Sequence, residues 1–334
     1  MIGLPGHCFA PFVKALGRGK TAHRALTEAE AEDAFGMILD GAATATQIGA
    51  FLMLLRMKEE TPAELTGMVR AARLRLQGSR AALAVDLDWP SYSGKRQHHP
   101  WYLLSALLLA SSGHRVLMHG CRPHAADRLF AGEALAALGI LPARSLDHAA
   151  QELDTRQFSY FELQTLSPAL QSLLDLRAEF GLRSPVNTLV RHLDPGHARA
   201  GLRSLHHPSY AALHVDSALS LGKTRVAVFR GEGGECELRA DADSALALVE
   251  RDAVRDITLP RARAERSPKP QHPSSGPLLA LWNDTVRDAY GLEAVIGTAA
   301  VALLAIGTAT GADAARAEAS RLWERRPPLG SFLR

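Results

Sequence analysis

The chain has 334 residues, of which 47% are hydrophobic and 22% charged, and its formal net charge is +3. These proportions are typical of a globular protein with a buried core, and they exclude a disordered, fibrous or wholly membrane-embedded chain. The length suits two domains or one large one. Only six of the 38 basic residues are lysine. Arginine carries a planar fork that suits phosphate, although the codon usage of a GC-rich genome would produce the same excess.

The first 80 residues carry three signals for the start of a helix. Thr27 is followed by Glu30 and Thr61 by Glu64, which is the spacing of a capping box. Thr44, between these two, stands before another apolar stretch, and Gly41 is placed to end the helix that starts at Thr27. This segment is therefore predicted to be entirely α-helical.

Short apolar runs separated by helical stretches follow from residue 81 onward. The runs are residues 82–87, 115–119, 211–215 and 224–229, with weaker candidates at 237–239 and 256–259. Strands that alternate with helices indicate a mainly parallel sheet. Residues 260–277 hold five prolines and four basic residues, which predicts an exposed loop, and residues 278–290 and 294–326 are expected to be closing helices.

The cysteines and the apolar segments bear on location. Cys8, Cys121 and Cys236 lack the spacing of a disulfide framework or a zinc site. The N-terminus shows no apolar signal core, so a cytoplasmic protein is expected. Residues 294–312 are uncharged and long enough to be tested as a membrane span. Their glycines and threonines favour a helix packed on the sheet, and no membrane partner is expected.

Positive charge is concentrated in residues 89–128. This stretch holds five Lys or Arg, five histidines and one acid, Asp127. Four aromatic residues are interleaved: Trp89, Tyr92, Trp101 and Tyr102. Such a mixture suits a surface that binds backbone phosphates and stacks bases. The alternative is a loop whose aromatic residues cap the core while its cations face water.

Four segments carry distinctive motifs: residues 25–73, with QIGAFLMLLRMKEET in the middle, VLMHGC at 116–121, GLRSPVN at 181–187 and VFRGEGGECEL at 228–238. These motifs resemble those of anthranilate phosphoribosyltransferases, of glycosyltransferase family 3, and residues 25–73 resemble the family's helical N-terminal domain. The resemblance covers roughly residues 14–326 and implies a nucleoside phosphorylase/phosphoribosyltransferase type II fold. In this α/β fold a small all-helical domain that forms the dimer is joined to a large domain with a mainly parallel central sheet.

The same resemblance implies domain boundaries. Residues 1–80 would form the helical dimerisation domain, and about 165–188 would return to it. Residues 81–164 and 189–334 would form the α/β domain.

The positions that carry catalysis in the family are altered here. The family's glycine-rich pyrophosphate loop corresponds to residues 88–99, DWPSYSGKRQHH, in which Gly94 is the one remaining glycine. Its phosphate ligands correspond to Trp101, Leu103 and Leu104, and two leucines offer a phosphate no hydrogen bond. The magnesium-binding acid pair becomes Cys236 and Glu237, so Glu237 is expected to be a vestigial metal ligand. An arginine that contacts anthranilate in the family corresponds to Arg177.

This combination is most similar to the YbiB-type paralogue group, which is described as binding nucleic acid without sequence preference. The resemblance therefore implies a homodimer that binds single- or double-stranded nucleic acid and requires no cofactor. The candidate nucleic-acid or phosphate-binding residues are Lys95, Arg96, Gly94, His98, His119, Gly120, Arg122, Arg177 and Asn187. Further arginines at Arg70, Arg73, Arg75, Arg80, Arg199 and Arg203 are candidates for extending the track.

Two other functions remain open from the sequence. One is an active glycosyl or phosphoribosyl transferase with an altered substrate, dependent on magnesium and phosphoribosyl pyrophosphate, in which Lys95 and Arg96 replace the backbone amides as the phosphate clamp. The other is a scaffold dimer whose basic loop contacts an acidic protein. No residue is assigned a catalytic role.

Overall fold

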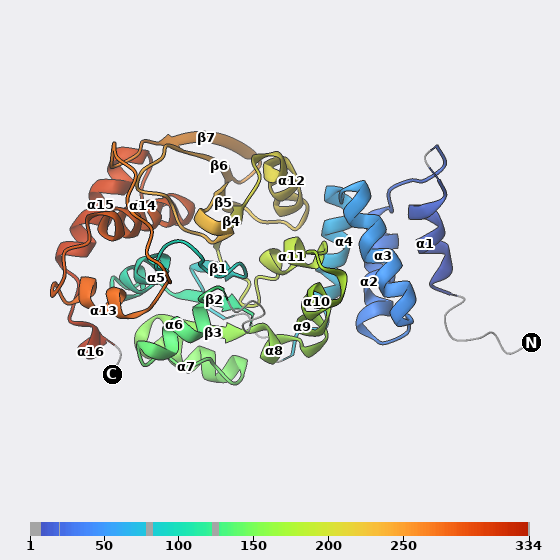
Figure 1. The fold of residues 1–334 in the computed structure, drawn as a ribbon, viewed down its shortest axis with the longest axis horizontal. Helices are drawn as coiled ribbons and strands as arrows, with labels where there is room; N and C mark the ends of the chain where they lie inside the picture. The colour runs from blue at the N-terminus through green and yellow to red at the C-terminus, as the bar shows by residue number, and fades with distance from the viewer. Residues whose placement is uncertain (1–7, 20, 78–82, 122–126, 333–334) are drawn as a thin grey trace, which may run out of the picture.

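Four N-terminal helices form a bundle at one end of the molecule (Figure 1). The structure is a computed structural model, and it describes residues 8–19, 21–77, 83–121 and 127–332. The helices are α1 (Ala10–Gly17), α2 (Glu28–Leu39), α3 (Ala45–Lys58) and α4 (Pro62–Arg73). Thr27, Thr44 and Thr61 each accept a hydrogen bond from the backbone N–H three residues later, in complete capping boxes. The three predicted helix starts are therefore confirmed.

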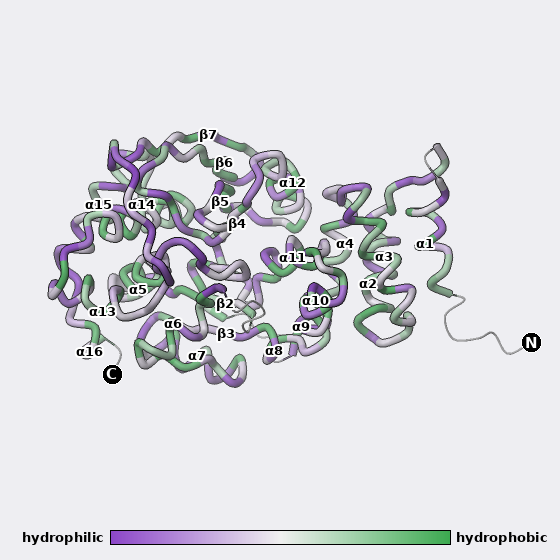
Figure 2. Tube along the Cα trace, in the orientation of Figure 1, coloured by the Kyte–Doolittle hydropathy of each residue, from purple (hydrophilic) through white to green (hydrophobic). Residues whose placement is uncertain are grey.

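A later segment packs with these helices. One hydrophobic cluster joins Phe35, Phe51 and Leu65 to Leu170 and Val186. The later residues belong to a series of short helices: α8 (Leu163–Leu166), α9 (Pro168–Asp175), α10 (Arg177–Phe180) and α11 (Val186–Leu189). Figure 2 shows both hydrophobic and hydrophilic residues along α4, as an amphipathic helix requires.

The rest of the described chain is built on a seven-stranded sheet with the order β3-β2-β1-β4-β5-β6-β7. The strands are β1 (Leu87–Ser91), β2 (Val116–Gly120), β3 (Phe158–Glu162), β4 (Ala200–Leu205), β5 (Arg225–Arg230), β6 (Ser244–Glu250) and β7 (Ala253–Leu259). The first five strands pair in parallel, whereas β6 and β7 are antiparallel. The expected helical domain and mainly parallel sheet are confirmed.

Helices cover both faces of the sheet. Alternate residues of β5 show this, because Ala227 and Phe229 belong to one hydrophobic cluster while Val226 and Val228 belong to another. The helices of this part are α5 (Tyr102–Ser111), α6 (Ala131–Ala137), α7 (Leu146–Arg156), α12 (Ala211–Ser220), α13 (Gly276–Trp282), α14 (Ala289–Ile306), α15 (Ala312–Glu324) and α16 (Leu329–Phe332). Burial on both faces is usual for parallel strands.

Helix α14 is the one described helix that is long and apolar enough to span a membrane. In this fold 78% of its length is buried, and it packs on α5, α15, β4 and β5. Its position is that of a core helix, as its glycines and threonines indicated.

The strand predictions were partly wrong. Residues 211–215 lie in α12, and residues 237–239 form no strand. The first strand begins at Leu87, where the predicted run ends, and includes Pro90. Pairing with β4 covers only Leu87 and Asp88, so Pro90 lies beyond the part of β1 that has neighbours on both sides, and its missing N–H is tolerated.

Candidate functional site

The candidate site lies beyond the carboxyl ends of β1, β2, β4 and β5. The strand order reverses between β1 and β4, and ligands of open α/β sheets bind at such a switch point. The loop after β1 supplies Ser93, Gly94 and Lys95, and the loop after β5 supplies the acids Glu232, Glu235 and Glu237. The two loops lie against each other through buried polar contacts.

The first of these contacts is an ion cluster around Lys95. Its ammonium contacts Glu232 and lies 2.6 Å from Glu237 Oε1, and the side chains of Lys95 and Glu237 are fully buried. The other oxygen of Glu237 accepts a hydrogen bond of 2.9 Å from the backbone N–H of Tyr102, the first residue of α5. Burial opposes the charge on Lys95, but the two carboxylates raise its pKa. Burial, followed by the repulsion of Glu232, raises the pKa of Glu237 to about 7.

The second contact places a carboxylate on the backbone of the loop after β1. Glu235 Oε1 accepts hydrogen bonds of 2.6 Å from the N–H groups of both Ser93 and Gly94. Gly94 has a φ of +66°, and a turn of this kind points successive N–H groups at one anion. Burial raises the pKa of Glu235, and the nearby Arg191 opposes this shift. A protein carboxylate thus occupies the N–H groups that an external phosphate would need.

A third buried group connects β1, β2 and β4. Asp88 accepts from Arg203 at 2.7 Å and lies 3.0 Å from His119 Nε2. The other ring nitrogen of His119 is 2.6 Å from the hydroxyl of Tyr92. Burial opposes ionisation of Asp88, but Arg203 and His119 hold its pKa below the usual range. All four side chains are at most 2% exposed, so this network holds the strand ends together and is closed to solvent.

The three buried groups around Lys95, Glu235 and Asp88 are together called the sealed interior. Two solvent-accessible cavities border it. The larger has a volume of about 780 Å³ and the smaller about 360 Å³, and both are lined by Leu205 and His206. Their Lys and Arg lining comprises Arg96, Arg128, Arg230, Arg239, Arg266 and Lys269 in the larger cavity and Arg56, Arg177, Arg183 and Arg191 in the smaller. The smaller cavity has a single acidic lining residue, Glu60, whereas four acids line the larger: Glu232, Asp241, Asp243 and Asp256.

Several of these cations have no ion pair with a carboxylate of the described chain. They are Arg56, Arg128, Arg177, Arg183, Arg230, Arg266 and Lys269. Burial, followed by the charges of Arg191, Arg128 and Arg177, lowers the pKa of Arg183 to about 10. Burial and then His207, Arg183, Arg230 and Arg128 lower the pKa of His206. Cations of both cavities therefore repel one another, and the excess of positive charge is clearest in the smaller cavity, where four arginines face one acid.

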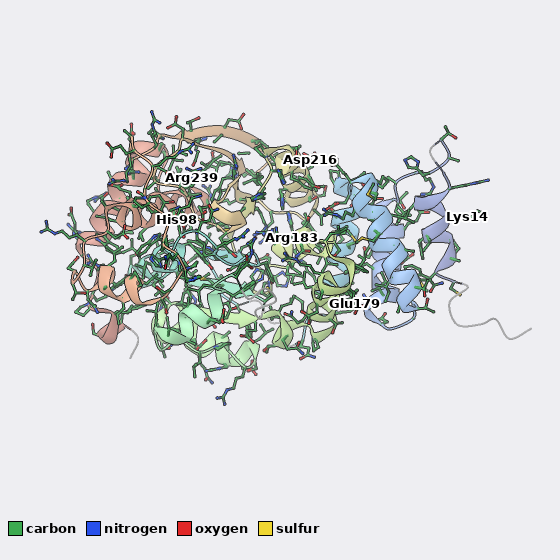
Figure 3. The ribbon with its side chains drawn as sticks, in the orientation of Figure 1. Lys14, His98, Glu179, Arg183, Asp216 and Arg239 are labelled. Atoms are coloured by element: carbon green, nitrogen blue, oxygen red, sulfur yellow. The ribbon has the colours of Figure 1, made fainter. Side chains whose placement is uncertain are left out.

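Figure 3 shows the extent of this basic region. Arg183 lies near α10 and α11, between the helical bundle and the sheet, whereas His98 and Arg239 lie toward the C-terminal helices. The two arginines of the cavities that the figure labels, Arg183 and Arg239, therefore lie well apart along the molecule.

Three predicted site residues line the cavities, in addition to His98. Arg96 is exposed and 3.1 Å from Asp127. Arg177 lines the smaller cavity, and its Nη1 is buried without a hydrogen-bond partner among the described residues.

Asn187 lines the same cavity as Arg177 and accepts a hydrogen bond from the backbone N–H of Ser184. His98 is 7% exposed and stacks on Tyr290 at 4.4 Å between ring centres, and burial lowers its pKa to about 4.

Other predicted site residues are inside the protein. Lys95, Gly94, His119 and Gly120 are buried, which disagrees with the expectation that they contact a polyanion. The carboxylate predicted to be a vestigial metal ligand, Glu237, contacts Lys95 instead. Arg122 lies outside the described residues.

The aromatic residues predicted to stack bases are also buried. Trp89, Tyr92, Trp101 and Tyr102 are each at most 2% exposed. The alternative considered for this segment, in which its aromatic residues cap the core, is the one that the structure supports.

The proposed arginine track along α4 is likewise not supported. Arg70 contacts Glu28, Arg75 pairs with Asp40 at 2.6 Å, and Arg73 donates to the backbone oxygens of His192 and Leu193. Arg203 is buried against Asp88, Arg199 is exposed beside Asp86, and Arg80 lies outside the described residues. Arg70, Arg73, Arg75 and Arg203 therefore already contact acids or backbone oxygens of this chain.

Sequence reasoning overlooked most of the cationic lining. Arg183 lies inside the GLRSPVN motif, and Arg266 and Lys269 lie in the proline-rich loop that was noted for its charge. Arg56, Arg230, His206 and His207 carry no local signal, because only the fold brings them to the two cavities.

Comparison with known proteins identifies the family. The glycosyl transferase family helical bundle domain matches residues 11–75. An anthranilate phosphoribosyltransferase of Nitratidesulfovibrio vulgaris is 32% identical over 69% of this chain and 68% of that protein. One from Methylobacterium nodulans is 30% identical over 89% of both chains. This chain belongs to the anthranilate phosphoribosyltransferase family.

Solved structures of the family share the fold. The anthranilate phosphoribosyltransferase of Thermus thermophilus superimposes with a TM-score of 0.76, covering 96% of this chain and 99% of that chain at 24% identity. The enzyme of Saccharomyces cerevisiae, in complex with PRPP and Mg, gives a TM-score of 0.77 over 97% of this chain and 95% of that chain at 14% identity.

The residues of this chain do not fit the magnesium named in that complex. Glu232 and Glu237 already hold the Lys95 ammonium. Burial raises the pKa of Cys236 to about 12, and a thiol is a poor ligand for a cation that prefers oxygen. Among the described residues no group of three or more His, Cys, Asp or Glu is arranged to hold a metal.

Proposed function

We propose that this chain is a sequence-independent nucleic-acid-binding protein on a phosphoribosyltransferase fold, of the kind represented by the YbiB-type paralogue group. The observation that carries the proposal is the set of Lys and Arg residues that lines both cavities without a carboxylate partner among the described residues. A polyanion bound along these cavities would neutralise charges that now repel one another. Contacts to backbone phosphates carry no sequence information, so little sequence preference is expected.

The sealed interior supports binding over catalysis. The N–H groups of Ser93 and Gly94 are taken by Glu235, and the acids beside them are taken by Lys95. A phosphoribosyl substrate with magnesium would have to displace both groups. A polyanion in the outer cavities displaces neither.

Fluorescence anisotropy with labelled single-stranded and duplex oligonucleotides tests this function. Four phosphate contacts on duplex DNA would weaken affinity about 100-fold between 50 and 200 mM salt, because each neutralised phosphate releases counterion. Oligonucleotides of unrelated sequence should bind within a few-fold of one another. An absent or salt-insensitive signal would overturn the proposal.

A second candidate is a phosphoribosyltransferase with an altered substrate, and membership of the anthranilate phosphoribosyltransferase family favours it. Its phosphate clamp would have to come from the arginines of the cavities, because Lys95 is buried. Titration calorimetry with phosphoribosyl pyrophosphate and magnesium tests it. Saturable heat that requires magnesium would favour the transferase, whereas no heat at millimolar ligand would exclude it.

The protein is further proposed to act as a homodimer through its helical bundle. Met57 at the end of α3 is 82% exposed and Leu74 after α4 is 63% exposed, so this end of the molecule presents large apolar side chains to solvent. Light scattering after size-exclusion chromatography measures the mass directly, and a mass of 35.9 kDa would contradict the dimer.

A further inference from the structure

The cluster of Lys95, Glu232 and Glu237 has the form of a cation site. Two carboxylates from the loop after β5 converge on one positive nitrogen, which they contact from separate positions in the chain. Lys95 and Glu237 are fully buried, and Glu232 is 9% exposed. Two ionised acids this close together in the interior require a cation, since unpaired buried charges are strongly unfavourable.

The adjacent anion position is filled in the same way. Glu235 receives the two N–H groups of the turn at Ser93 and Gly94, and three side-chain hydrogen bonds from Arg191 to Ser93, Ser204 and the Gly234 carbonyl hold the two loops together. Lys95 directly follows this turn, so one short segment carries both the anion-binding turn and the resident cation. An internal anion and an internal cation thus lie side by side where the fold places its ligand crevice.

We propose that the Lys95 ammonium is the resident cation of this site, so that the wild-type chain takes no divalent cation there. Removal of the ammonium would leave a buried two-carboxylate site that a divalent cation can fill. Glu232 and Glu237 would supply oxygen ligands, and water would complete the coordination, as is usual for magnesium and manganese. This inference does not require nucleic-acid binding, although Glu232 also lines the larger cavity.

Thermal unfolding of Lys95→Ala with and without manganese tests the inference. In EDTA we expect a Tm roughly 5 °C below that of the wild type, because the variant leaves buried carboxylates unpaired. Millimolar MnCl2 should restore most of the loss. The wild-type Tm should be the same in EDTA and in MnCl2.

Electron paramagnetic resonance of Mn²⁺ gives a direct count of bound ions. We expect about one ion bound per Lys95→Ala chain and none at this site in the wild type. The matched control is Lys95→Met/Glu232→Gln/Glu237→Gln, which removes the charges together; it should fold in EDTA and show no response to manganese. One ion per wild-type chain that is lost in Glu232→Gln/Glu237→Gln would overturn the proposal, as would Lys95→Ala without bound manganese.

A variant that does not fold in EDTA still gives a result. Refolding of Lys95→Ala from urea is then compared with and without millimolar MnCl2. Recovery that requires manganese supports the inference. Failure under both conditions, while the neutral triple variant folds, contradicts it.

Discussion

At the scale of single residues, position and not charge decides what each cation does. Lys95 and Arg203 are fully buried in ion pairs, whereas Arg183 and Arg230 line the cavities without a carboxylate partner among the described residues. The same formal charge stabilises the interior in the first case and remains available to a ligand in the second. Substitutions of the two kinds should therefore change different measurements.

We expect Arg183→Ala/Arg230→Ala to weaken nucleic-acid binding by similar factors for all sequences and to reduce the salt slope by about two. The reason is that two phosphate contacts are lost while the interior stays intact. Anisotropy titrations at four salt concentrations measure the slope. Arg321→Ala is the matched control, because Arg321 lies on α15 and is paired with Glu318 on the same helix. If the slope stays at the wild-type value, the polyanion does not lie along these cavities.

At the scale of helices and strands, the close packing of α2 on α4 depends on a glycine. A Cβ atom added to Gly67 would overlap the backbone oxygen of Glu28 and lie 2.8 Å from the backbone nitrogen of Glu32. Backbone atoms of a helix cannot move aside as a flexible side chain can. Gly67 therefore sets the distance between these two helices.

Gly67→Ala is expected to destabilise the protein by about 3 kcal/mol, the upper part of the range for overpacking. Gly49→Ala in α3 is the control, because its Cβ would meet only Phe180 at 3.7 Å and alanine favours a helix by about 1 kcal/mol over glycine. Urea unfolding of both variants measures the difference. Equal stabilities would show that α2 and α4 can separate without cost.

Local signals account for which elements were predictable. The capping boxes at Thr27, Thr44 and Thr61 are fixed by residues three apart, so the sequence alone predicts them. Strand β4 was missed because its buried Arg203 resembles an exposed residue until Asp88, 115 residues away, is placed beside it. The contacts of Lys95 with acids 137 and 142 residues away are non-local in the same sense, so its charge suggested a surface role.

At the scale of the whole molecule, buried histidines connect stability to pH. His192 and His214 stack, with 2.7 Å between His192 Nε2 and His214 Nδ1. Burial lowers the pKa of both, that of His214 to about 3. An unfolded chain takes up these protons near pH 6.5, so it binds more protons than the folded chain between about pH 6.5 and 3. Stability contributed by the pair is complete above pH 6.5 and is lost as the pH falls.

His192→Leu/His214→Leu should therefore lose less stability than the wild type on acidification. Replacing both partners together avoids leaving one ring nitrogen without its hydrogen bond. Urea midpoints at neutral pH and at two acidic pH values give the comparison, and each histidine contributes a slope of up to about 1.4 kcal/mol per pH unit. Identical pH dependence in the two proteins would show that the pair is not responsible.

The ion cluster around Lys95 also bears on the conditions under which the protein stays folded. When a fold depends on a dissociable ion, its stability changes with the logarithm of the free ion concentration, by mass action. An ammonium attached to the chain cannot be diluted, chelated or outcompeted by the phosphates of nucleotides. The stabilisation that Lys95 gives to its two acids therefore does not depend on the concentration of any free ion. It stays constant in a cell whose supply of divalent cations varies.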